Sequence, residues 1–69
     1  MLANALELRA ECVRKNVTLA NLATKIGVNE ATLHRKIKGD SDFSRNELQI
    51  IRSVLGLNNK KFLDIFFNE

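Results

Sequence analysis

Apolar residues recur along this chain at the three- and four-residue spacing of an amphipathic α-helix, in five separate segments. In the first segment Leu8 and Cys12 share one face, which predicts a helix from about Ala5 to Lys15. Asn4 and Glu7 have the form of a capping box, in which each side chain bonds to the free backbone amide of the other residue. We therefore expect this helix to be closed at its start by its own side chains.

Two short helices follow, with a turn of only three residues between them. Thr18 is the expected N-cap of a helix over Leu19–Ile26, and Asn29 is the expected N-cap of a helix over Glu30–Lys38. Gly27 lies in the turn and supplies the positive φ angle that such a turn requires. Two helices joined by so short a turn must cross steeply, as in a helix-turn-helix motif.

The apolar residues of this segment agree with a steep crossing. Ala23 is small at a point where helix backbones approach each other closely. Val28, Leu33 and Ile37 are expected to wedge the second helix of the pair onto the core. Residues 18–39 are thus predicted to form a helix-turn-helix core that projects one helix outward.

Two further helices complete the chain. Ser44 and Glu47 form a second capping box, at the start of a helix that Gly56 ends. Phe43, just before this box, is expected to fill part of the core. A fifth helix is expected from Asn58 to about Phe67, so the pattern as a whole predicts a compact all-α domain of five helices.

The composition fits one domain over residues 1–69, with no Pro and only three Gly to interrupt helices. Cys12 is the single cysteine, so it has no partner for an internal disulfide or a zinc finger, and we expect it to be a buried apolar residue. No segment resembles a membrane span or a signal peptide. We therefore expect a cytoplasmic protein that uses no metal and no cofactor.

The net charge of +3 is concentrated in one segment. Residues 25–38 carry four basic side chains and one acidic side chain, namely Lys25, Arg35, Lys36, Lys38 and Glu30. The remainder of the chain is neutral in sum. A local excess of positive charge is typical of a surface that attracts DNA phosphates, although a basic stripe on a helix is also common as a merely solvated face.

The third predicted helix combines this charge with an outward face. Leu33 and Ile37 mark its buried side, so the opposite side carries four other residues. These are Ala31, His34, Arg35 and Lys38. A face that is small at its start and basic along its length suits the major groove of double-stranded DNA.

Individual residues of this helix have side chains that can read bases. Arg35 can bond a guanine with two hydrogen bonds, and Ala31 can touch a thymine methyl group. His34 can donate to a purine N7, or it can be a plain solvated histidine. Glu30 can accept from cytosine N4, or it can simply be a first-turn acid that stabilises the helix dipole.

A phosphate-binding position is expected at the start of the fourth helix, at Ser44, Arg45 and Asn46. The first amides of a helix lack intrahelical partners and lie at the positive end of the helix dipole, so they bind anions well. Thr18 opens the second helix in the same way. The alternative for Ser44 is that it acts as a cap alone.

Four stretches of the chain resemble the Cro and lambda-repressor-like (XRE) family of helix-turn-helix proteins, and a fifth is similar to the fourth helix of short phage-type members. They are Leu8–Glu11, Val17–Ala23, Lys25–Asn29, Ala31–Gly39 and Phe43–Leu57, within a resemblance that covers about residues 5–66. The resemblance implies a five-helix domain that represses or activates transcription as a dimer on a near-palindromic operator.

The resemblance also implies roles for particular positions. The positions at which the family reads bases are Asn29, Glu30, Ala31, His34 and Arg35. The positions at which it contacts phosphate are Thr18, Lys38, Ser44, Arg45 and Asn46. At one position the chain departs from the family pattern, because Leu19 stands where the family usually has a glutamine that braces the recognition helix.

The fifth predicted helix is more apolar than packing on one side requires. Its inward stripe is formed by Phe62, Ile65 and Phe66, and Leu63 and Phe67 widen the apolar arc. Exposed apolar area of this kind often marks an interface. We therefore assign Leu63, Phe66 and Phe67 to a surface for a second subunit or another partner; the alternative is a final turn folded against the body.

Two functions fit these features. The first is a sequence-specific transcriptional regulator of phage or mobile-element type, which inserts residues 30–38 into the major groove as a homodimer. The second is an antirepressor, a helix-turn-helix module that docks on a partner repressor protein. An enzyme is not expected, because the sequence shows no catalytic pairing, no phosphate-binding glycine loop and no cluster of metal ligands.

Overall fold

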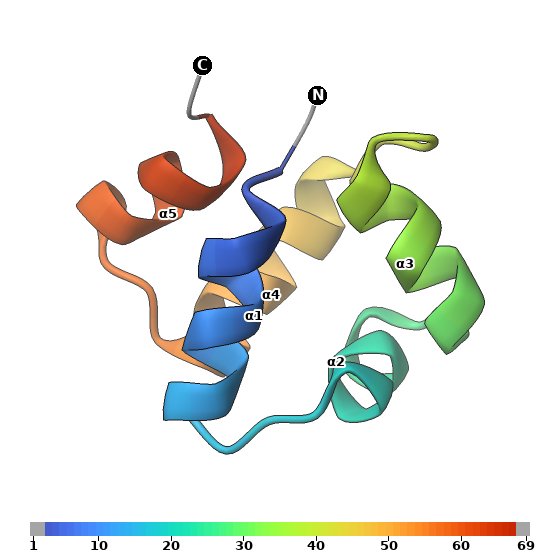
Figure 1. Cartoon of the computed structure of the whole chain (residues 1–69), viewed down its shortest axis with the longest axis horizontal. Coiled ribbons are helices and arrows are strands. Elements are labelled where there is room, and N and C mark those ends of the chain that lie inside the picture. Colours follow the sequence, from blue (N-terminus) through green and yellow to red (C-terminus); the bar gives the residue numbers. More distant parts are fainter. Residues whose placement is uncertain (1–2, 68–69) are drawn as a thin grey trace.

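Five α-helices make up the chain in the computed structural model, which describes residues 3–67 (Figure 1). They are α1 (Ala5–Arg14), α2 (Leu19–Ile26), α3 (Glu30–Lys38), α4 (Arg45–Leu55) and α5 (Asn59–Phe66). The predicted all-α class and the order of the five helices are confirmed. Within the described part of the chain, no helix has the length and apolar character needed to cross a membrane.

The side chain just before each helix forms the cap that the local sequence predicts. Thr18 Oγ1 accepts from the Asn21 amide at 3.0 Å, and Asn29 Oδ1 accepts from the Thr32 amide at 2.7 Å. At α4 the capping box is complete, because Ser44 Oγ accepts from the Glu47 amide while Glu47 Oε1 accepts from the Ser44 amide. These bonds satisfy backbone donors that a helix leaves open at its start.

The capping box predicted at the start of α1 is only half formed. Asn4 Oδ1 accepts from the Glu7 amide at 3.2 Å, but the Asn4 amide donates to the carbonyl of Ile65 in α5, at 2.6 Å. The carboxylate of Glu7 instead lies 3.0 Å from Lys61 Nζ, also in α5. The second half of the box is therefore replaced by two contacts that hold α1 against α5.

The turn between α2 and α3 has the predicted length and uses glycine as expected. Gly27 has φ of +85°, and its amide bonds back to the carbonyls of the last turn of α2. The next amide, that of Val28, donates to the Ala23 carbonyl at 3.0 Å, and its side chain packs against the core. α2 packs against both α3 and α4, so α3 is carried at one end of the molecule (Figure 1).

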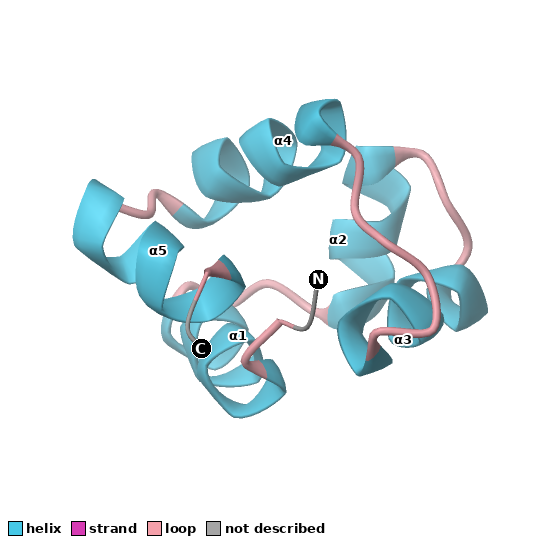
Figure 2. Cartoon of the chain, turned by 90° about the horizontal axis from the view of Figure 1, so that it is seen from above, coloured by secondary structure: helices cyan, strands magenta, loops and turns pink. Residues whose placement is uncertain are grey.

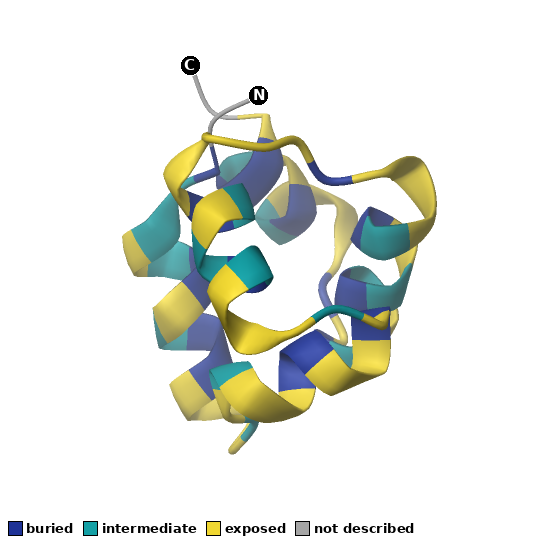
Figure 3. Cartoon of the chain, turned by 90° about the vertical axis from the view of Figure 1, so that its right-hand side faces the viewer, coloured by how far each residue is buried: buried dark blue, intermediate teal, exposed yellow. Residues whose placement is uncertain are grey.

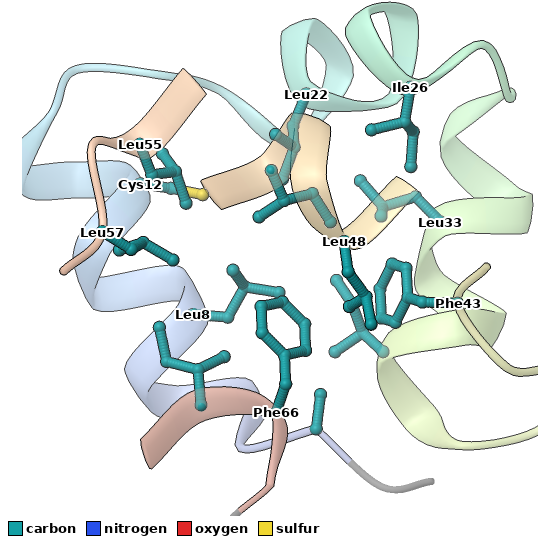
Figure 4. Packing of buried hydrophobic residues seen from close by; sticks show 14 of the residues in the cluster. Leu8, Cys12, Leu22, Ile26, Leu33, Phe43, Leu48, Leu55, Leu57 and Phe66 are labelled. Carbon is teal, nitrogen blue, oxygen red and sulfur yellow. The ribbon is translucent and has the colours of Figure 1, made fainter. Parts of the chain in front are cut away.

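Side chains from all five helices and the segment before α4 meet in one apolar core (Figure 4). Leu8, Leu33 and Ile51 are fully buried in it. Phe43 is buried as predicted, and its ring meets the ring of Phe66 edge to face, with the centroids 5.5 Å apart.

Phe66 belongs to this core and not to the exposed surface of α5. Its side chain is only 1% exposed and reaches into the centre of the molecule (Figure 4). The assignment of Phe66 to a subunit interface was therefore wrong, because a residue without exposed surface in one protomer has none to offer a partner. Leu63 and Phe67, by contrast, are 53% and 54% exposed.

A nearly buried ion pair joins α3 to the start of α4. Lys36 Nζ lies 3.1 Å from Glu47 Oε1 and donates to the carbonyl of Asp42 at 2.9 Å, while its side chain is only 12% exposed. Burial alone would raise the pKa of the Glu47 carboxyl, but hydrogen bonding from Ser44 and the ammonium of Lys36 outweigh it and hold the pKa below its usual value. The Glu47 carboxyl is therefore ionised at neutral pH.

We expect Phe66→Ala to remove about 3–5 kcal/mol from the free energy of unfolding, because it leaves a cavity between the helices. This loss is a large share of the stability of a small domain. Phe67→Ala is the matched control, and its effect should be much smaller, about 1 kcal/mol, because only about half of this residue is buried. Urea unfolding followed by circular dichroism measures both; equal losses in the two variants would contradict the placement of Phe66.

We expect Glu47→Gln to lower the free energy of unfolding at pH 7 by about 1–3 kcal/mol, because Gln keeps an acceptor for the Ser44 amide but leaves the ammonium of Lys36 without its carboxylate. A carboxyl whose pKa is lowered by folding adds stability above its unfolded pKa of about 4.3, and this stability is lost as the pH falls through the folded value.

The variant should therefore lose less stability than the parent between neutral pH and pH values below about 4, in urea titrations at each pH. Glu30→Gln, at an exposed acid of α3, is the control. The free energy of unfolding of this variant should fall between neutral and acidic pH by the same amount as that of the parent. An unchanged pH dependence in Glu47→Gln would show that the ion pair does not stabilise the fold.

Candidate nucleic-acid interface

The side of α3 opposite the core is open to solvent, as expected from the helical spacing. Leu33 and Ile37 are buried, whereas Ala31, Arg35 and Lys38 are exposed. Figure 3 looks onto the side of the molecule that carries α3 and shows exposed and half-buried positions along the outward side of this helix. The structure thus brings these three predicted site residues together on one surface.

Two of the basic side chains of this surface have an acidic neighbour on the same stretch of chain. Lys38 Nζ lies 3.6 Å from Asp40 Oδ2. His34 is half-buried, and its Nε2 lies 3.6 Å from Glu30 Oε2, one helical turn earlier. Both contacts are largely solvated, so their free energies are small and a phosphate or a base edge can compete with them.

Arg35 differs from these two residues. Within residues 3–67 no carboxylate pairs with it, and Nη2 instead donates to Thr32 Oγ1 at 3.2 Å. This hydrogen bond orients the guanidinium along the outer side of α3 and leaves most of its N–H donors free. Arg35 therefore presents an uncompensated positive charge at the centre of the outward face.

Lys36 does not contribute to this surface, although its charge was counted in the basic segment. Its ammonium is held between Glu47 and the carbonyl of Asp42, and it lies 6.0 Å from the centre of the Phe43 ring. The helical spacing itself indicates that Lys36 lies near the buried side of α3, because it falls only about 60° from Leu33 around the helix. The positive charge available on α3 is therefore smaller than the sequence count indicates.

The start of α4 offers a second group of polar donors. Ser44, Arg45 and Asn46 are all exposed, and Ser44 Oγ accepts from the Glu47 amide while its own hydrogen remains free to donate. The amides of Arg45 and Asn46 stand at the first two helical positions, where no intrahelical acceptor exists. The contact between Lys36 and Glu47 holds this helix start beside α3.

Two further predicted residues have structural roles that leave part of their side chains available. Asn29 is exposed, and its Oδ1 is occupied as the cap of α3, whereas its amide nitrogen retains two donors. Thr18 is also exposed and caps α2. Thr18 lies at the end of α2 away from the turn, and within residues 3–67 no hydrogen bond joins it to α3.

Leu19 shares a pocket with residues of α1. It is half-buried, packs against the core, and lines this pocket together with Val13 and Val17. The glutamine that the resemblance implies would brace the helix that follows. In this chain the position instead contributes an apolar side chain to the junction of α1 and α2.

The exposed apolar residues of α5 lie far from α3, since these two helices occupy opposite ends of the molecule (Figures 1 and 2). Phe67 contacts the ring of Phe62 at a centroid distance of 6.0 Å, and Leu63 stands in the exposed turn before it. The candidate DNA surface and the candidate subunit surface are therefore separate.

Over residues 3–67, no three histidine, cysteine or acidic side chains gather closely enough to hold a metal ion. The candidate site consists instead of the outward side of α3 and the exposed start of α4. Comparison with models of protein families, with curated proteins and with solved structures finds no match to this chain.

Proposed function

We propose that this protein is a sequence-specific DNA-binding regulator of transcription, of the Cro and lambda-repressor-like helix-turn-helix kind. In this proposal α2 and α3 form the helix-turn-helix and α3 enters the major groove. The observation that carries the proposal is the exposed face of α3, with Arg35 free of any acidic partner in the described chain and the start of α4 held beside it.

The chemistry of α3 supports reading of base edges. A guanidinium with free N–H donors matches the O6 and N7 acceptors of guanine, and Arg35 has this freedom. Ala31 adds little bulk one turn earlier, so the backbone of α3 can approach the bases. Asn29, Glu30 and His34 flank this position, and they supply donors and an acceptor for neighbouring base pairs.

The remaining predicted residues are suited to the phosphate backbone. Lys38 can exchange its solvated contact with Asp40 for a phosphate oxygen. The start of α4 offers the free amides of Arg45 and Asn46, the hydroxyl of Ser44 and the positive end of a helix dipole. Contacts at two separate places would fix how α3 lies in the groove.

The proposal includes a homodimer joined through Leu63 and Phe67 on α5. These two half-exposed apolar side chains are adjacent and lie at the end of the molecule away from α3. A symmetric pair joined there would carry two copies of α3, which is the number that a near-palindromic operator with two half-sites requires.

A second candidate function, docking on a partner repressor protein, is favoured by the same exposed pair, Leu63 and Phe67. The dependence of binding on salt separates the two functions. Contacts to phosphate weaken steeply as salt increases, whereas an apolar protein interface changes little.

The DNA-binding proposal is tested by selecting bound sequences from a random pool of duplexes and measuring affinity for the selected DNA. We expect a consensus with two half-sites and an affinity that falls steeply between about 50 and 200 mM salt. Arg35→Ala should weaken binding about 5- to 150-fold, equivalent to about 1–3 kcal/mol, and should relax the preference at one base pair of each half-site.

Lys60→Ala is the matched control, because Lys60 is an exposed cation at the opposite end of the molecule, paired with Asp64. It should leave the affinity within about twofold of the parent. The proposal fails if the parent protein selects no consensus, or if Lys60→Ala weakens binding as much as Arg35→Ala does.

Dimerisation is tested with the double variant Leu63→Ser and Phe67→Ser. Because both side chains are half exposed, the variant should keep its helical circular dichroism while its mass in solution falls from dimer to monomer. Leu6→Ser, at an exposed apolar residue of α1, should leave the mass unchanged. A parent protein that sediments as a monomer at every concentration would refute the proposed interface.

A further inference from the structure

α1 carries an exposed apolar stripe that the helical pattern did not single out. Leu6 and Val13 are 82% and 80% exposed, the largest values among the large hydrophobic residues of the described chain. They are seven residues apart, so they lie on the same side of α1, separated by about 10 Å along its axis. Ala10 lies between them, and its small side chain leaves room in the middle of the stripe for a side chain of a partner.

A pocket of about 400 Å³ continues the stripe at the junction of α1 and α2. Val13 forms part of its wall together with the half-buried residues Val17 and Leu19, and Cys12 also lines it. Burial, together with the nearby Glu11 carboxylate, raises the pKa of the Cys12 thiol, so this part of the wall is uncharged at neutral pH. The pocket therefore suits an apolar side chain.

The charge beside this stripe is positive. Arg9 lines the pocket, is exposed, and forms no ion pair with any of residues 3–67. Both acidic residues of α1 are engaged elsewhere, Glu7 with Lys61 and Glu11 with Arg14. An acidic group on a partner would thus meet Arg9 without competition from a carboxylate of this chain.

We propose that the stripe of Leu6, Arg9 and Val13, together with the adjoining pocket, is a docking site for an acidic amphipathic helix of a partner protein. Such a helix would place apolar residues at i, i+4 and i+7 along α1, with one of them in the pocket. A carboxylate next to these residues would pair with Arg9. The site lies outside the proposed DNA surface and does not depend on it.

A second copy of this chain fits the stripe less well than an acidic partner does. If two α1 helices packed antiparallel with Leu6 against Val13, their two-fold axis would pass near Arg9 and Ala10. The two Arg9 guanidinium groups would then face each other across the axis, and like charges so placed repel. The charge of the stripe therefore selects a partner of different composition.

The test uses the full chain and two synthetic four-turn amphipathic helices with the same leucine stripe, one flanked by glutamate and one by lysine. Binding is followed by chemical-shift changes in the nitrogen-15 spectrum of the protein. We expect saturable binding of the glutamate peptide alone, with the largest changes at the amides of Leu6, Arg9, Val13 and Leu19. Arg9→Glu should transfer the preference to the lysine peptide, which a purely structural role of Arg9 would not do.

Leu6→Ser combined with Val13→Ser should weaken the glutamate peptide about tenfold or more and leave affinity for selected DNA unchanged. Leu63→Ser, on α5, is the matched control and should leave peptide binding unchanged. The proposal is overturned by equal binding of the two peptides, by no saturable binding, or by shift changes centred outside α1 and α2. A self-association of the parent chain that Leu6→Ser abolishes would assign the stripe to a second copy instead.

Discussion

The contact between Lys36 and Glu47 is the constraint on which the arrangement of the candidate site depends. α3 must be anchored firmly enough to hold a fixed position while its outer side remains free of neighbours. Two buried apolar side chains, Leu33 and Ile37, fix its inner side, and the ion pair fixes its edge against the start of α4. Because the ammonium also bonds to a backbone carbonyl, few of its donors are left unpaired, which is the condition for a buried charge to be tolerated.

Because of this contact, the basic residues of α3 have different roles: one stabilises the fold and another is exposed on the surface. Lys36 serves the fold, whereas Arg35, its neighbour in sequence, is directed outward and held by Thr32. Adjacent residues of a helix differ in direction by about 100°, so a single run of basic residues can serve both purposes. The proposed DNA-binding role therefore depends on fewer cations than the run contains, and on their position more than on their sum.

The polar residues at the helix starts combine two uses in a similar way. Asn29 and Ser44 are caps, and each retains a side-chain donor that the cap does not use. A cap of this kind costs no additional residue in a chain of only 69. The exposed side chains of the two proposed protein-binding surfaces, Leu63 and Phe67 on one and Leu6, Arg9 and Val13 on the other, lie outside the core, which is why the surfaces can differ in charge and in partner.

The helix boundaries could be read from the sequence because the interactions that set them are local. Caps such as Thr18 and Asn29 bond to an amide three residues away. The positive φ angle of Gly27, which ends α2, is a property of that single residue. The buried faces could be read as well, because a period of about 3.6 residues separates inward from outward positions without knowledge of the neighbours. These signals were enough to predict five helices and the outward face of α3.

The remaining features depend on which helices meet, and spacing along the chain does not contain that information. The Glu7 carboxylate was expected to accept from the Asn4 amide. In the structure each group instead has a partner in α5: the Asn4 amide donates to the Ile65 carbonyl, and the Glu7 carboxylate pairs with Lys61. Phe66 and Phe67 are equally apolar in sequence, but only the packing of α5 decides that one enters the core and the other stays outside. Sequence thus determined the local hydrogen bonds and periodicity, whereas tertiary structure alone decided the contacts between residues far apart in the chain.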